Sequence, residues 1–206
     1  MTKKDSYPLP RIDDIFDSLT DTRWFSSLDL ASGYWQVGVV QKDREKTAFT
    51  TKIGTFEFNV MPFGLTNAPA TFQRLMDVIM HSAIGKFVLV YLDDINVYSR
   101  TFEEHLQHLQ WVFDQLRFAN LGCRPEKCEF MRQKLKFLGH EISAEGLSSD
   151  PDKVEKVQNC PAPKNLMQLR SFIGLASYYR KFIKDFLKKA APLYELTRKD
   201  VVFNWQ

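Results

Sequence analysis

The sequence has few cysteines and no long apolar run, and each absence excludes a class of protein. Its three cysteines, Cys123, Cys128 and Cys160, are an odd number without tight spacing, so we expect no disulfide framework. No uncharged apolar stretch is long enough to span a bilayer, and the first ten residues hold no apolar signal core. We therefore expect a protein of the cytoplasm or nucleus that is not secreted and has no membrane partner.

The histidines and cysteines also suggest a zinc site, formed by His105, His108, Cys123 and Cys128. The two histidines share a helix face, but the fourteen-residue gap that follows and the C-x4-C spacing match no common zinc pattern. Ordinary buried thiols beside a solvated helix face are the preferred interpretation.

The net charge of +3 is small but unevenly distributed. Residues 1–116 carry 11 basic and 15 acidic side chains, a balance of −4, whereas residues 117–206 carry 17 and 10, a balance of +7. An acidic first part and a basic second part fit metal ions in one lobe and a polyanion held by the other. A chance asymmetry of the solvated surface explains the same numbers equally well.

Hydrophobic periodicity predicts an α+β fold, because two β-hairpins force antiparallel pairing and amphipathic helices lie between and after them. A hydrophobic content of 44% supplies a sizeable core. The expected elements are a helix over 11–19, a strand over 24–30, a hairpin over 47–60, a helix over 70–83, a hairpin over 86–99, a helix over 102–120, a β-prone segment over 130–142, and helices over 150–158, 166–183 and 193–197.

Two adjacent acids, Asp93 and Asp94, lie at the turn of the second hairpin, between strands that read as core. Burying either carboxylate beside the other costs several kcal/mol unless a cation compensates. Asp29 ends an apolar strand and precedes a turn of small residues. If that strand lies beside the hairpin, the three acids share one cleft suited to two Mg²⁺ ions and phosphoryl transfer. Taken alone, Asp29 could equally be a helix cap.

Several segments, in this order, resemble the reverse transcriptases of gypsy-type (Metaviridae) long-terminal-repeat retrotransposon polyproteins. The Y-x-D-D of residues 91–94 resembles their catalytic motif. The other segments are FSSLDLASGYWQV at 25–37, MPFGLTNAPATFQ at 61–73, FLGHEIS at 137–143 and LRSFIGLASYYRKFI at 169–183. The resemblance covers essentially the whole chain. It implies a polymerase palm with partial fingers over 1–147, a fingers hairpin at about 38–67, and a helical thumb with the start of a connection over 148–206.

The resemblance also implies a role for individual residues. Two Mg²⁺ ions, replaceable by Mn²⁺, would be bound by Asp29, the backbone of Leu30, Asp93 and Asp94. The incoming nucleotide would contact Ala31, Ser32, Gly33, Tyr34 and Phe63, with Tyr34 as a steric gate against a 2′-hydroxyl. Primer and template would contact Gln73, Tyr91, Leu138, Gly139, Arg180 and Lys184. Lys127 falls near the position proposed to protonate the leaving pyrophosphate.

The implied reaction joins a deoxynucleoside triphosphate (dNTP) to a primer 3′-hydroxyl on an RNA or DNA template. The expected partners are primer–template nucleic acid, dNTP, and the protease, ribonuclease H and integrase domains of a polyprotein. The family's basic fingers segment is represented only by its last part, so we expect reduced activity, and a virus-like particle becomes the expected cytoplasmic location. The alternatives are an inactive remnant that binds nucleic acid, a structural protein whose acids are turn residues, and a nuclease.

Overall fold

The computed structural model describes residues 3–8, 19, 21–198, 200–201 and 203–205. They belong to two compact units, Met1–Leu135 and Lys136–Gln206, each of which is described by itself. The helix expected over 11–19 lies outside the described residues, apart from Leu19. None of the helices in these ranges is long and apolar enough to cross a membrane.

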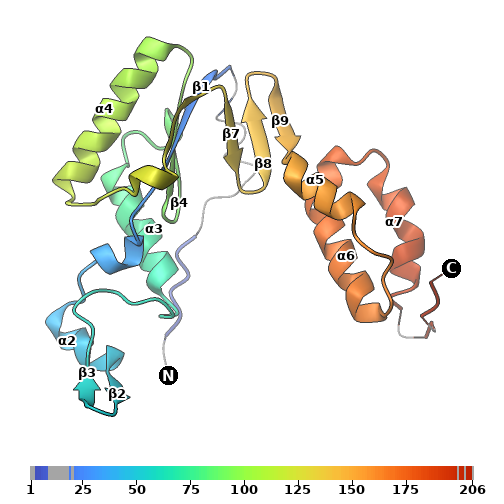
Figure 1. Cartoon of the computed structure of the whole chain (residues 1–206), viewed down its shortest axis with the longest axis horizontal. Helices are drawn as coiled ribbons and strands as arrows, with labels where there is room; N and C mark the ends of the chain where they lie inside the picture. Colours follow the sequence, from blue (N-terminus) through green and yellow to red (C-terminus); the bar gives the residue numbers. More distant parts are fainter. Residues whose placement is uncertain (1–2, 9–18, 20, 199, 202, 206) are drawn as a thin grey trace. The chain divides into compact units, whose positions relative to one another are not determined.

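The first unit is built on a four-stranded antiparallel sheet with the order β4-β5-β1-β6, which confirms the α+β prediction (Figure 1). A separate two-stranded hairpin, β2-β3, falls within the predicted fingers hairpin. The elements are β1 (Trp24–Asp29), η1 (Gly33–Gln36), α2 (Gln41–Arg44), η2 (Glu45–Thr47), β2 (Phe49–Thr51), β3 (Gly54–Phe56), α3 (Ala68–Ile79), β4 (Val88–Tyr91), β5 (Asp94–Ser99), α4 (Phe102–Phe118), η3 (Pro125–Lys127) and β6 (Glu129–Arg132).

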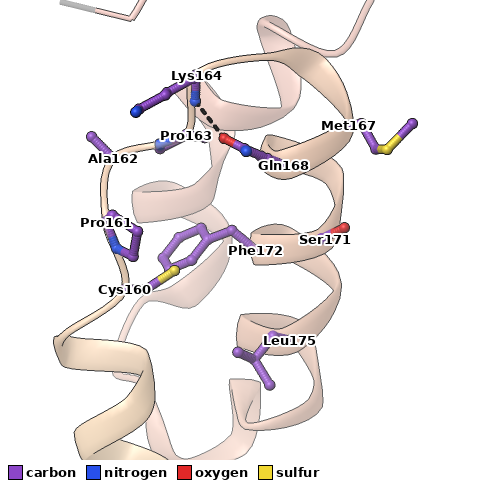
Figure 2. A pocket seen from close by; sticks show the side chains of 10 residues that line it. All are labelled: Cys160, Pro161, Ala162, Pro163, Lys164, Met167, Gln168, Ser171, Phe172 and Leu175. Carbon is purple, nitrogen blue, oxygen red and sulfur yellow. Dashed lines mark hydrogen bonds between the residues drawn. The ribbon is translucent and has the colours of Figure 1, made fainter.

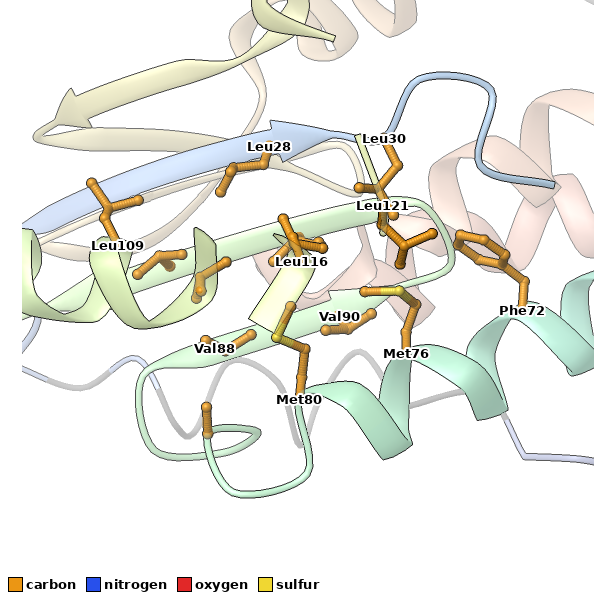
Figure 3. Close-up of a cluster of buried hydrophobic side chains, with 14 of the residues drawn as sticks. Leu28, Leu30, Phe72, Met76, Met80, Val88, Val90, Leu109, Leu116 and Leu121 are labelled. Carbon is orange, nitrogen blue, oxygen red and sulfur yellow. The ribbon is translucent and has the colours of Figure 1, made fainter. Parts of the chain in front are cut away.

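One face of this sheet is apolar and packs against the helices α3 and α4 (Figure 3). The register places Leu28 opposite Ile95 and Val90 opposite Ile95, so these side chains share a face. Phe72 and Met76 of α3 are fully buried against it, and burying a side chain of this size stabilises the fold by about 1.5–3 kcal/mol. Because strand side chains alternate between faces, the neighbouring acids point away from the helices.

A buried polar network joins α4 to the same sheet. His105 is fully buried, with Nε2 2.7 Å from the Ser26 hydroxyl and Nδ1 2.8 Å from the Ser99 hydroxyl. The Ser99 hydroxyl also lies 2.8 Å from Nδ1 of His108. Both ring nitrogens of His105 are therefore engaged in hydrogen bonds that suit the neutral ring.

We expect the stability of the first unit to fall between about pH 6.5 and pH 4 because of His105. Burial, followed by the charge of His108, lowers the pKa of His105 to about 4, whereas an unfolded histidine titrates near 6.5. The unfolded chain therefore takes up a proton first as the pH falls, which costs about 3 kcal/mol over that range. Urea unfolding at pH 7.5, 6, 5 and 4 measures it.

His81, which is exposed, supplies the matched control for that experiment. His105→Gln is expected to lower stability at pH 7.5 but to flatten the decline towards pH 4, whereas His81→Gln keeps the wild-type slope. Equal slopes for wild type and His105→Gln would contradict the assignment.

The three-stranded sheet β7-β8-β9 begins in β7, in which the division between the units falls, and the second unit holds β8, β9 and the helices that follow. The predicted boundary at 147/148 differs from this division, because the strands β8 and β9 belong to the second unit; the assignment of palm and thumb stays a prediction. The elements are β7 (Lys134–Phe137), β8 (His140–Ser143), β9 (Gly146–Ser149), α5 (Pro151–Gln158), α6 (Leu166–Tyr178), η4 (Arg180–Phe182) and α7 (Phe186–Glu195).

The prediction of one helix over 166–183 and another over 193–197 is wrong. The α6 helix ends at Tyr178, and α7 already begins at Phe186. Asp185 has a φ of 58°, in the left-handed region, so the helical path is interrupted before α7. Apolar periodicity alone does not reveal such a break. The basic residues at 180–189 are consequently divided among η4, the turn that carries Lys184 and α7, rather than lying on one helix face.

Candidate active site

The three acids meet where the two central strands of the four-stranded sheet, β1 and β5, reach one edge of the sheet with their adjoining ends. Asp29 is the last residue of β1, and its register partner is Asp94, the first residue of β5. Asp93 lies in the two-residue turn between Tyr91 and Asp94, which are paired with each other. The amide of Leu30 donates to the carbonyl of Asp93 over 3.3 Å. The strand that ends at Asp29 therefore lies beside the hairpin of Asp93 and Asp94, as a shared site for the three acids requires.

Electrostatics at this edge disfavour the charged form of Asp94. Burial raises the pKa of Asp94, and the charges of Asp93 and Asp29 raise it further. Lys127 opposes this effect, with its ammonium nitrogen 3.4 Å from Oδ2 of Asp29. The edge is therefore a place where additional positive charge is stabilised.

The donor set fits a hard divalent cation, since carboxylate and backbone oxygens are the ligands that Mg²⁺ prefers. The side chains do not close into a ligand group, however. Across the described ranges, no three or more His, Cys, Asp or Glu side chains are arranged to hold a metal ion. Asp29 is instead engaged in an ion pair with Lys127.

The small-residue turn after β1 lies beside α3. Ser32 has a φ of 54°, and a Cβ on the buried Gly33 would approach Cζ of Phe72 to 2.7 Å, so the ring of Phe72 requires glycine there. The ring of Tyr34 lies 5.4 Å from those of both Phe63 and Phe72. Burial, followed by the charge of Asp93, raises the pKa of Tyr34. The predicted nucleotide residues therefore lie near the acids, with Phe63 exposed.

Sequence reasoning missed two residues that hold this turn. The Gln36 amide nitrogen donates to the carbonyls of Ala31 (2.9 Å) and Gly122 (3.0 Å), and its oxygen accepts from the Gly122 amide at 2.7 Å. Arg124 donates from its backbone to the carbonyl of Asp29 over 2.8 Å and from its guanidinium to the Ser32 hydroxyl over 3.2 Å. A signal existed for Arg124, a second basic residue near Lys127. Gln36 had none.

The structure does not favour the predicted contact of Gln73 with nucleic acid. Its side chain is fully buried, and its amide is engaged by Leu92, Asp77 and Val90. This leaves no exposed surface for a strand to touch, and Gln73 is instead attached to the turn that carries Asp93. Tyr91 is half-buried at the end of β4.

The remaining predicted contacts lie in the second unit. Leu138 (φ 49°) and Gly139 (φ 78°) form the tight turn between β7 and β8, and the Leu138 carbonyl accepts from the Tyr178 hydroxyl over 2.6 Å. A Cβ on Gly139 would lie 2.9 Å from the hydroxyl of Tyr179. Arg180 and Lys184 are exposed. The role of these residues at the duplex stays a prediction.

A groove of the second unit lies between the segment 160–164 and α6 (Figure 2). It is closed at one end by Gln168, whose oxygen accepts from the Lys164 amide over 2.8 Å. The ten residues drawn along it include no acidic side chain, so it offers no ligands for the metal chemistry predicted above.

Known proteins are similar to this chain over most of its length. A family profile described as "Reverse transcriptase (RNA-dependent DNA polymerase)" matches residues 1–142. The Pol polyproteins of the Drosophila melanogaster transposons opus and gypsy are 43% and 41% identical over 96% of the chain, which covers 20% and 19% of their lengths. A foamy viral protease–reverse transcriptase in complex with RNA/DNA hybrid is 28% identical with a TM-score of 0.85, over 99% of this chain and 28% of that one. The chain thus spans about a fifth of the curated relatives it matches.

Proposed function

Because the chain belongs to the reverse transcriptase family, we propose that it catalyses RNA-directed DNA synthesis, joining a dNTP to a primer 3′-hydroxyl on an RNA or DNA template. The observation that carries the proposal is the pairing of Asp29 with Asp94 across β1 and β5, with Asp93 in the adjoining turn. Three acids at one sheet edge are a costly arrangement that a structural role does not require.

Asp29, Asp93 and Asp94, with the Leu30 carbonyl, would hold two Mg²⁺ ions, for which Mn²⁺ can substitute. When bound, these ions supply charge neutralisation at the reacting phosphate. The chain's own residues do the rest in this proposal. The turn at 31–33 receives the triphosphate, and Tyr34 limits the sugar to a deoxyribose. Lys127, already beside Asp29, donates a proton to the leaving pyrophosphate.

The proposed partners are a primer–template duplex and a dNTP. The foamy viral relative is in complex with RNA/DNA hybrid, and a further foamy viral structure contains double-stranded DNA. We assign Arg180 and Lys184 to the duplex, since exposed basic side chains bind the phosphate backbone. We also assign Leu138 and Gly139 to it, because the glycine of this tight turn lets a strand approach the backbone closely. The relatives are Pol polyproteins, so we also propose that protease, ribonuclease H and integrase domains act with this one, in a cytoplasmic particle or the nucleus.

A primer-extension assay tests the proposal. The chain is mixed with dNTPs, Mg²⁺ and an oligonucleotide annealed to an RNA template, and extension that stops on chelation of Mg²⁺ is expected. Binding of the duplex that weakens steeply with salt, without extension, would instead select a nucleic-acid-binding remnant. Neither binding nor extension would overturn both interpretations.

A further inference from the structure

The turn that carries Asp93 is attached to a buried side chain of α3. The amide of Leu92 donates to Oε1 of Gln73 over 2.8 Å, and Gln73 is fully buried. Leu92 has a φ of 55°, in the left-handed region that a leucine seldom adopts. A conformation of this kind persists where its surroundings fix it. Here the fixing group is the Gln73 carbonyl oxygen.

The amide nitrogen of Gln73 forms a hydrogen bond on the side away from the turn. Its nitrogen donates to Oδ1 of Asp77, one helical turn along α3, over 2.9 Å. The second oxygen of Asp77, Oδ2, accepts from the hydroxyl of Tyr7 over 2.5 Å. A continuous chain of hydrogen bonds therefore runs from Tyr7 through Asp77 and Gln73 to Leu92.

The segment that carries Tyr7 also contacts α3 and Asn67, the residue that precedes α3. Arg74 forms an ion pair with Asp5 at 2.7 Å, and its guanidinium lies 4.6 Å from the centre of the Tyr7 ring. Asn67 accepts from the Asp5 amide over 3.0 Å and donates to the Lys3 carbonyl over 2.9 Å. Residues 3–8 are therefore bound to the helix, and Tyr7 is held beside Asp77.

We propose that Gln73 and Asp77 are positioning residues that hold the turn carrying Asp93, and that Tyr7 completes their hydrogen-bond chain. The catalytic consequence rests on the proposed function, whereas the structural link to Leu92 does not. The pattern has one direction: Asp77 accepts twice, Gln73 donates once to it, and the remaining Gln73 oxygen faces the Leu92 amide. Whether one residue of the chain donates or accepts therefore determines whether the next must accept or donate.

This direction permits a test by exchange. In Gln73→Glu, a carboxylate oxygen faces Asp77, so acceptor opposes acceptor. In Asp77→Asn, the new amide can turn so that its oxygen accepts from Gln73 and its nitrogen donates to the Tyr7 hydroxyl oxygen, so this variant is the milder of the two. The double variant restores a donor–acceptor pair between the two positions. Gln73→Glu is expected to lower kcat for primer extension about 10- to 100-fold with little change in the KM for dNTP, because a buried hydrogen bond is lost, and Asp77→Asn is expected to lower it less than about fivefold. The double variant should recover to within about tenfold of wild type, because its carboxylate still cannot donate to the Val90 carbonyl, which the Gln73 nitrogen contacts at 3.4 Å.

The chain contains a matched control pair. Gln110 donates to Asp114 over 3.0 Å at the same spacing, on the exposed face of α4. Gln110→Glu, Asp114→Asn and their combination should stay within about twofold of wild type. A loss as large as that at Gln73 would show that the exchange disturbs any helix, and would overturn the proposal.

A second measurement does not depend on activity. Hydrogen exchange of the Leu92 amide, followed by NMR, should be slow in wild type. It should be at least tenfold faster in Gln73→Glu, where repulsion by Asp77 turns the new carboxylate away from the Leu92 amide, and slow again in the double variant. If wild type makes no product while this pattern holds, the proposed function fails and the link stands. If Gln73→Glu does not fold, Tyr7→Phe replaces it, with an expected two- to fivefold faster exchange. Unchanged Leu92 exchange in a folded variant, or no recovery in the double variant, overturns the proposal.

Discussion

Primer extension is expected to fall at least about a thousandfold when Asp93 is replaced by asparagine. Asparagine keeps the shape of the side chain, so the two-residue turn between Tyr91 and Asp94 can form unchanged. It removes a charge from the group proposed to hold the metal ions. Single-turnover extension at saturating dNTP measures the loss.

The same substitution is expected to leave the fold as stable as before, or to stabilise it. Burial and the charges of Asp93 and Asp29 raise the pKa of Asp94, so removing one of these charges relieves a repulsion. The midpoint temperature of thermal unfolding should therefore not fall in Asp93→Asn. Asp114→Asn, a change on the exposed face of α4, is the control and should retain full activity. Extension that survives in Asp93→Asn would refute the catalytic assignment.

The elements around the acids could be predicted because their pattern is local. Alternating apolar residues on each side of Asp93 and Asp94 define a hairpin, and the strand that ends at Asp29 is recognisable in the same way. The pairing of Asp29 with Asp94 was a condition rather than a prediction, since strand order depends on contacts distant in sequence. The structure supplies that order as β4-β5-β1-β6.

The supporting residues could not be predicted, for a related reason. Gln73 and Gln36 are polar side chains in otherwise apolar segments, and their partners lie 19 and 86 residues away along the chain. Composition shows a polar residue but not the backbone amide that it will meet. The break before α7 depends on one left-handed residue, Asp185, which hydrophobic periodicity does not detect. Local pattern thus located the acids, while the groups that hold them follow from tertiary structure.

The two faces of strands β1 and β5 serve different purposes, one for stability and one for the acids. The face of β1 and β5 that packs on α3 and α4 is apolar and stabilises the unit, whereas the opposite face carries Asp29 and Asp94. A strand can serve both purposes because its side chains alternate. This explains why a site of like charges can be tolerated: the repulsion is confined to one end of strands whose other face is buried.

Replacing Tyr34 with valine is expected to reduce discrimination against ribonucleotides about 10- to 100-fold. The ring is held by Phe63 and Phe72 at 5.4 Å each and is close enough to Asp93 for its pKa to be raised by that charge, after burial. A held ring cannot move aside for a 2′-hydroxyl, and the overlap costs about 1–3 kcal/mol. Valine removes most of the ring while remaining apolar.

The ratio of kcat/KM for a dNTP to that for the matching ribonucleotide measures this effect. We expect the ratio to fall because ribonucleotide use rises, while dNTP use changes little. Tyr194→Val, in α7 of the second unit, is the control and should leave the ratio unchanged. A Tyr34→Val variant that loses both activities equally would mean that the ring merely packs the site. Selection of the sugar would then have to come from another residue near the turn at 31–33.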